Sequence, residues 1–249
     1  SCPAGLTLYD IFAYNHKHNW ANGEENRDGG NDNHSWNCGA EGETQDAGVN
    51  ALRERMMKNG WALLMVSQGV PMVLMGDEMG RSQGGNNNTY CHDNDINWLD
   101  WSLLQKHPSV FEFAKKAIAF RHAHPVLRPR VHMQHRDYAG SGCADIRWHG
   151  TQAWNGDWGG GARAIAWMLC GKHAKGGRVR DEHIYVAVNT YWDALNFELP
   201  RPPSGDWHVF ANTGMQAPHD VHEPGREPRL ADQGSMLVGP RSIVILVGK

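Results

Sequence analysis

Apolar residues between positions 51 and 66 recur at the spacing of a helix. The apolar positions near one face are Leu52, Met56, Leu63 and Val66, and the charged positions that point away are Arg53, Arg55 and Lys58. Gly69 follows this pattern, and glycine readily adopts the left-handed conformation that closes a helix. The spacing therefore predicts an amphipathic helix of about four to five turns.

The pattern changes directly after Gly69 to a short unbroken apolar run over residues 70–75. A run of this length predicts a strand that is buried on both faces, as in a parallel sheet. A polar loop follows, and a second helix is predicted to begin near Pro108 and to end before Pro125. Helix, buried strand, polar loop and helix in this order are typical of a TIM barrel, which binds ligands at the carboxyl ends of its strands.

Beyond residue 130 the apolar runs become shorter and are separated by turn-forming clusters such as NGDWGGG and RPPSGD. Strands are predicted at 145–149, 162–169, 183–189, 195–199, 207–211, 236–238 and 242–247. Short strands between turn clusters favour an antiparallel β-sandwich. We therefore predict two domains, with residues 1–130 as part of a barrel and residues 131–249 as a sandwich.

The loop after residues 70–75 is rich in amides, carboxylates and indoles. It contains Asp77, Arg81, three consecutive asparagines at 86–88, Tyr90, Trp98 and Trp101. Amides and carboxylates hydrogen-bond the hydroxyls of sugars, and aromatic rings stack on their apolar faces. A phosphate site would need several cations or a helix N-terminus. We interpret the loop as a sugar site, although turn formation is the alternative explanation for each single asparagine.

Residues 11–48 form a second polar segment with almost no periodic apolar pattern. Long irregular segments inside compact domains are uncommon and are usually functional if they are ordered. His18 and Trp20 are its candidate sugar contacts, through an imidazole and an indole. Trp36 is another aromatic candidate, but a single tryptophan in a long loop is slightly more typical of an anchor.

Several short motifs occur in the order found in one enzyme family. They are GLTLYD at 5–10, YNHKHN at 14–19, NGEENRDG at 22–29, SWNCGAEG at 35–42 and LRERMMKN at 52–59, followed by GDE, GR, GNNN and WLDW between 76 and 101. In these motifs the sequence resembles isoamylase-type starch and glycogen debranching enzymes of the alpha-amylase superfamily, glycoside hydrolase family 13. The resemblance is dense over residues 5–130 and looser to the end. It implies an α/β plus all-β fold, namely the carboxy-terminal part of a (β/α)8 TIM barrel followed by an antiparallel β-sandwich.

The same resemblance implies a function. Enzymes of this type hydrolyse α-1,6-glucosidic branch linkages, so a branched α-glucan such as amylopectin or glycogen is the expected partner. The substrate-binding residues that it implies are Asp77, Arg81, Asn87, Asn88, Tyr90, His18 and Trp20. It also implies a homo- or hetero-oligomer with an active isoamylase, and a location in the plastid stroma of a plant or alga or otherwise in the cytoplasm.

Catalytic residues are expected to be absent from this chain. The family carries a His-Asp pair before the glycine that matches Gly5, whereas Pro3 and Ala4 stand there in this sequence. The other two catalytic carboxylates of the family lie upstream of all matched motifs. Retaining hydrolysis needs two carboxylates about 5 Å apart, and the adjacent Asp77 and Glu78 would point to opposite sides of a strand end. Two alternatives to an enzyme part therefore stay open, a non-catalytic glucan-binding or regulatory subunit and a structural remnant of a truncated gene.

The composition mainly argues against certain partners and types of site. The 249 residues carry a formal net charge of −3 with a pI near 6.6, which gives no electrostatic reason to expect nucleic acid or an anionic membrane. The five cysteines are scattered without a C-x-x-C pair, so we predict reduced thiols rather than a disulfide framework or a zinc site. The histidines lack the spacing of a helical metal motif, so neither a metal nor another cofactor is expected. Three further tryptophans, at 154, 158 and 192, are expected to pack in the core or between domains, with a surface sugar site as the alternative.

Overall fold

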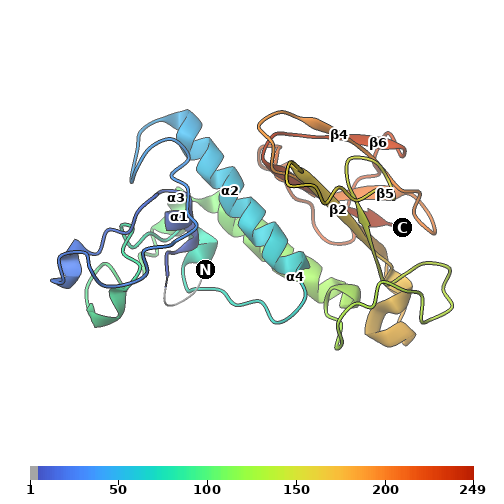
Figure 1. Cartoon of the computed structure of the whole chain (residues 1–249), viewed down its shortest axis with the longest axis horizontal. Helices are drawn as coiled ribbons and strands as arrows, with labels where there is room; N and C mark the ends of the chain where they lie inside the picture. Colours follow the sequence, from blue (N-terminus) through green and yellow to red (C-terminus); the bar gives the residue numbers. More distant parts are fainter. Residues whose placement is uncertain (1–4) are drawn as a thin grey trace. The chain divides into compact units, whose positions relative to one another are not determined.

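The computed structural model describes residues 5–249, which divide into two compact units (Figure 1). The first unit comprises the described residues up to Trp61 together with Val70–Lys115, and the second comprises Ala62–Gly69 together with Lys116–Lys249. The division in the sequence near residue 130 stays a prediction. Pro3 and Ala4, which replace the family's His-Asp pair, lie outside the described residues.

Two helices provide most of the regular structure before the sheets. They are α2, Ala47–Val66, and α4, Pro108–Ala123, which lie side by side in Figure 1. In the first unit, the Ser109 hydroxyl donates a 2.6 Å hydrogen bond to Glu54. In the second, the Arg121 guanidinium donates to three carbonyls at the end of α2 and beyond it, those of Met65, Ser67 and Gly69. Carbonyls at the end of a helix lack an N–H donor from a following turn. By supplying donors to them, Arg121 caps the C-terminus of α2.

Both predicted helices are confirmed, but α2 buries a different face from the predicted one. Arg53 is only 1% exposed, and its guanidinium donates to the backbone carbonyls of Asn37 and Ala40. Lys58 is also buried and donates to Glu54 at 2.7 Å. Leu63, expected to point inward, is exposed. A helical pattern cannot reveal the burial of Arg53, because a buried charge needs partners and those of Arg53 lie outside the helix.

Short helical segments complete the first part of the chain. They are α1, Leu8–Ile11; η1, Trp20–Asn22; η2, Asp77–Met79; η3, Thr89–Cys91; and α3, Leu103–Lys106. Long loops over 23–46 and 80–102 connect them with little regular structure. None of the helices in residues 5–249 combines the length and apolar character that crossing a membrane requires.

The predicted buried strand at 70–75 is wrong. This segment forms no strand, and the side chain of Val70 is 95% exposed. Met72, Val73 and Met75 are exposed as well. A parallel strand is stabilised by neighbours that accept and donate its backbone hydrogen bonds, and no strand of the described residues pairs with this segment. A TIM barrel is therefore not seen in residues 5–249.

The second unit contains the predicted antiparallel sheet. The strands are β1, Ile146–His149; β2, Ala164–Leu169; β3, His183–Asn189; β4, Leu195–Glu198; β5, Trp207–Asn212; β6, Ser235–Val238; and β7, Ser242–Gly248. Five of them form a sheet in the order β1-β2-β3-β7-β5, and β4 pairs with β6. Two short helical segments belong to this unit: η4 (Pro125–Leu127) precedes β1, and η5 (Gly171–Gly177) lies between β2 and β3 in the sequence. All seven predicted strands are found at or within a few residues of their expected positions.

One apolar core joins the two sheets. It contains alternate residues of β2, β3 and β7, together with β4, β5 and β6 residues. The fully enclosed side chains include Met168, Tyr185, Phe197, Trp207 and Leu246. Side chains alternate between the two faces of a strand, so one face of the larger sheet lies against the β4-β6 pair.

The cysteine prediction is wrong for one pair. Cys143 and Cys170 form a disulfide, with their Cα atoms 6.4 Å apart. Cys38 and Cys91 are free, as predicted, and Cys2 lies outside the described residues. The pair is 27 residues apart in sequence, and only the pairing of β1 with β2 brings the two residues together.

The core of the second unit predicts a large stability loss on truncation of Phe197. Phe197→Ala should lower the free energy of unfolding by about 3–5 kcal/mol, because it removes a fully buried ring and leaves a cavity. Asn196→Ala, at the exposed neighbouring position in β4, is the matched control and should change stability by less than about 0.5 kcal/mol. Urea unfolding followed by tryptophan fluorescence measures both, and equal midpoints would contradict the shared core.

Candidate functional site

The two polar loops of the first unit are joined by side-chain amides. Asn87 accepts a 2.8 Å hydrogen bond from the Asn19 side chain, and its backbone N–H donates to Asn19 Oδ1 at 3.0 Å. The Asn87 amide nitrogen donates to Asn33 Oδ1 at 2.6 Å and to the Gly30 carbonyl at 2.8 Å. These bonds span more than fifty residues of sequence. They bring the asparagine run and the 14–37 loop together, and they use all the hydrogen-bonding groups of the Asn87 side chain.

The neighbouring asparagines extend this network. Asn86 donates to Asn22 Oδ1 at 2.6 Å, and Asn88 donates to Asp28 Oδ2 at 2.8 Å. Asn22 also donates to Asp28 Oδ2 at 2.6 Å. The two amide donors lower the pKa of the Asp28 carboxyl, so it is ionised at neutral pH.

Close approach in this network requires a glycine at position 29. Gly29 has a φ of 70°, and a Cβ atom there would lie 2.2 Å from Asn87 Oδ1. Only a residue without a side chain allows both the left-handed backbone and the contact.

Asp77 and Arg81 are both buried and bind backbone groups. The Asp77 carboxylate accepts from the N–H of Leu8 at 2.9 Å and from that of Leu74 at 3.3 Å. The Arg81 guanidinium donates to the carbonyls of Met75 at 3.1 Å and Asn97 at 2.7 Å. Both side chains hold the ends of the 76–97 loop.

Aromatic side chains of the same two loops are open to solvent. Tyr90 is 86% exposed and Trp20 is 66% exposed. Trp98 and Trp101 are exposed as well, and the Trp98 indole donates to Asp93 at 3.0 Å. Exposed rings in loops whose backbones are held by polar contacts are suited to stack on a sugar.

His18 is half-buried against Glu41, with Nε2 2.9 Å from Oε1. Glu41 accepts from the N–H groups of Asn15 at 2.8 Å and His16 at 3.3 Å, and from the Asn37 side chain at 3.1 Å. Burial alone would raise the pKa of Glu41, but these hydrogen bonds together lower it to about 2. Glu41 therefore fixes the loop that carries His18.

Sequence reasoning did not predict which side chains join these loops. The side-chain oxygens of Asn19, Asn22 and Asp28 accept from Asn87, Asn86 and Asn88 and so connect the asparagine run to the 14–37 loop. In the same unit, Asp10 accepts from the Ser82 hydroxyl at 2.6 Å. Burial raises the pKa of Asp10, while its hydrogen bonds oppose that change. The residue types are visible in the sequence, but their pairing is long-range.

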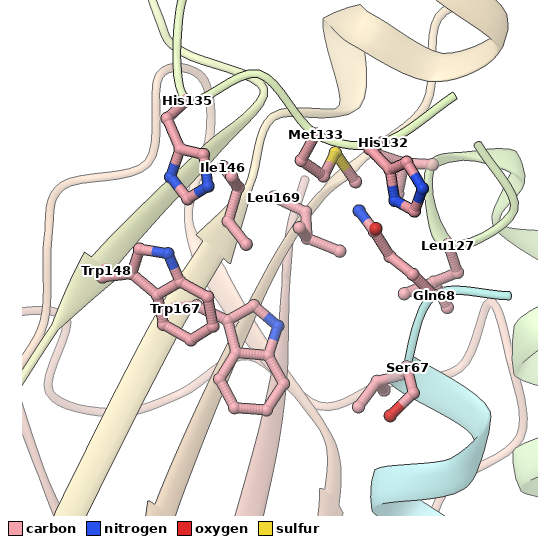
Figure 2. Close-up of a pocket in the computed structure, with 12 residues that line it drawn as sticks. Ser67, Gln68, Leu127, His132, Met133, His135, Ile146, Trp148, Trp167 and Leu169 are labelled. Carbon is pink, nitrogen blue, oxygen red and sulfur yellow. The ribbon is translucent and has the colours of Figure 1, made fainter. Parts of the chain in front are cut away.

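A cavity of about 470 Å³ lies in the second unit, and none of the predicted site residues lines it (Figure 2). Trp148 and Trp167 face each other in the β1–β2 register, with ring centroids 5.8 Å apart, and form one wall. Figure 2 shows His132, His135 and Gln68 around the same space. Trp154, Trp158 and Trp192 do not line it and are exposed, so their predicted packing in the core is wrong.

The depressed pKa of Glu41 predicts a pH-dependent stability. A carboxyl whose pKa is lowered by folding stabilises the folded state above its unfolded value near 4.5, and this contribution is lost as the pH falls toward 2. The melting temperature of the wild type should therefore exceed that of Glu41→Gln at about pH 6, and the difference should shrink at about pH 3. Glu24→Gln is the control at an exposed position in the same loop. A difference that is independent of pH would contradict the assignment.

Comparisons with known proteins match both units. Residues 147–236 match the family described as "Isoamylase 1-3, C-terminal". The chain is 45% identical over 206 residues to the "Glycogen operon protein GlgX homolog" of Mycobacterium tuberculosis, covering 79% of this chain and 29% of that protein. It is 41% identical over 221 residues to "Isoamylase 1, chloroplastic" of Arabidopsis thaliana, covering 88% of this chain and 26% of that protein. The chain thus spans less than a third of each relative.

Solved structures of pullulanases match the fold of this chain. The pullulanase from Bacillus acidopullulyticus covers 99% of this chain, which spans 23% of it, with a TM-score of 0.62 and 21% identity, and so supports the fold. The pullulanase from Paenibacillus barengoltzii in complex with maltohexaose and alpha-cyclodextrin covers 79% of this chain, which spans 25% of it, with a TM-score of 0.56 and 27% identity. The resemblance seen in the sequence motifs is confirmed: this chain is similar to the carboxy-terminal portion of isoamylase-type debranching enzymes.

Proposed function

We propose that this chain forms part of an isoamylase-type debranching enzyme that hydrolyses α-1,6-glucosidic linkages in starch or glycogen. The observation that carries the proposal is the identity of 45% and 41% to proteins named for the glycogen operon and for isoamylase. The structure adds that the motif-bearing loops are joined by a continuous amide network. A branched α-glucan is the proposed partner.

Within this function we assign two layers to the predicted site residues. Asp77, Arg81 and Asn87 form a buried layer that holds the two loops in place. The second layer contacts sugar: Tyr90 and Trp20 offer exposed rings. His18 and Asn88 are half-buried members of the second layer, and their side chains carry polar groups that can pair with hydroxyls.

We infer that this chain supplies no catalytic carboxylate. Both oxygens of Asp77 accept backbone N–H groups, and Glu78 accepts from the N–H of Gly76 at 3.0 Å. Carboxylates held in this way brace a loop and are poorly placed to act as a nucleophile and an acid on opposite sides of one bond. The reaction is therefore assigned to the assembled enzyme and not to these residues alone.

A non-catalytic glucan-binding subunit is the second candidate. The exposure of Tyr90 and Trp20 favours this candidate, because both rings belong to this chain and are open to a glucan. We also propose a location. If the source is a plant or an alga, the protein is in the plastid stroma, because the Arabidopsis relative is named chloroplastic; in other sources it is in the cytoplasm.

The purified chain should release no linear chains from amylopectin, because none of its carboxylates is assigned to the chemistry. Iodine staining and a reducing-end assay measure this, with an intact isoamylase as the positive control. Hydrolysis that is lost in Asp77→Asn or Glu78→Gln would overturn the inference and make that pair catalytic.

The two layers predict opposite mutant behaviour. Tyr90→Ala should weaken retention of the chain in an amylopectin affinity gel by about 1–3 kcal/mol of binding free energy, with little change in melting temperature. Asn87→Ala should instead lower the free energy of unfolding by about 1–3 kcal/mol, since Asn19 and Asn33 lose a buried partner. If Tyr90→Ala binds amylopectin like the wild type, the exposed layer is not the sugar site.

A further inference from the structure

Three side chains of metal-binding type meet at one end of the larger sheet of the second unit. Cys170 directly follows β2, Cys143 lies three residues before β1, and His183 begins β3. One donor atom from each residue lies within 4.8 Å of those of the other two. Cys170 and His183 are buried and Cys143 is half-buried, so solvent has little access to the group.

The backbone around the two cysteines is fixed by contacts other than the disulfide. The Cys170 N–H donates to the Asp145 carbonyl at 3.1 Å, in continuation of the β1–β2 ladder. His173 Nε2 donates to the Cys143 carbonyl at 2.8 Å, and Lys172 donates to the Ser141 carbonyl at 3.0 Å. The two sulfur atoms therefore stay close to each other when the bond between them is broken.

The turn before Cys143 is held in the same way. Asp137 accepts from the N–H of Ser141 at 3.0 Å and from that of Gly142 at 2.7 Å. This places Ser141 Oγ 3.5 Å from Cys143 Sγ and 3.9 Å from Cys170 Sγ. In a tetrahedral zinc site with bonds of about 2.3 Å to sulfur and about 2.1 Å to oxygen, the sulfur–oxygen edge is about 3.6 Å. The hydroxyl, which also contacts His173 Nε2 and Asp137 Oδ1 at 3.1 Å each, thus lies close enough to both sulfur atoms to be a candidate fourth ligand.

We propose that the reduced forms of Cys143 and Cys170 bind one divalent cation of the zinc class together with His183, and that the Ser141 hydroxyl takes the fourth position. Two thiolates and an imidazole select such a soft cation over magnesium or calcium, which prefer oxygen ligands. The inference does not depend on the glucan function.

The chemistry balances in two steps. A dithiol reductant donates two electrons and two protons to the Cys143–Cys170 bond, which gives two protein thiols and a cyclic disulfide of the reductant. The cation then displaces both thiol protons to solvent, and the two thiolates neutralise its charge. Because a disulfide offers no thiolate, the oxidised and metal-bound states exclude each other.

The test uses the full chain and cobalt(II) as a spectroscopic probe for zinc. The reduced chain, without oxygen, should bind one equivalent with thiolate-to-cobalt charge-transfer absorption and the visible bands of a tetrahedral ion, and zinc should displace the cobalt. After oxidation the chain should bind none, and a thiol titration should find two fewer thiols. Cys143→Ser and His183→Gln should each weaken binding by about tenfold or more.

Cys91→Ser, at an exposed free cysteine of the first unit, is the matched control and should bind cobalt like the wild type. Circular dichroism checks that each variant is folded. Cys143 is only half-buried, so Cys143→Ser keeps the test decisive if His183→Gln unfolds. Absence of charge-transfer absorption in the reduced wild type, or unchanged binding in folded Cys143→Ser, would overturn the proposal.

Discussion

The structure of the first unit depends on one constraint: its backbone and amide groups must find hydrogen-bond partners. Its long loops contain few helical turns and no strand among the described residues, so regular secondary structure satisfies only part of their polar groups. Side chains satisfy many of the others, since Asn19 and Asn87 exchange two hydrogen bonds and Arg53 binds loop carbonyls from within α2. An unpaired buried amide costs about 1–3 kcal/mol, so the loops hold one arrangement only while these partners stay matched.

The second unit is stabilised differently, since its polar backbone groups are paired along ladders and its side chains are free to form an apolar core. All strand pairs in both sheets are antiparallel. Tyr185 and Trp207 pack with ring centroids 5.8 Å apart in this core. Polar groups concentrate instead at the strand ends, where Cys143, Cys170 and His183 meet.

The different ways in which the two units are stabilised explain which features the sequence predicts and which it does not. The strands of the second unit and the limits of α4 follow from local signals, namely apolar runs, turn clusters and the prolines at 108 and 125. The buried face of α2 does not, because the partners of Arg53 are backbone carbonyls 13 and 16 residues away. The run at 70–75 has the composition of a buried strand, but composition does not supply a neighbouring strand. The Cys143–Cys170 pair depends on strand pairing, which no cysteine spacing reveals. Motif resemblance found the residues of the candidate site, but not their division between buried and exposed positions.

The position of β7 has a consequence for biosynthesis. This strand is the last of the seven in the sequence, yet it lies between β3 and β5 and pairs with both. During translation the earlier strands emerge first. Until residues 242–248 have left the ribosome, β3 lacks one of its two partners and β5 lacks its only partner strand in the sheet. Until then those unsatisfied edges are open to pairing with other nascent chains. The second unit therefore completes its larger sheet only after translation of β7.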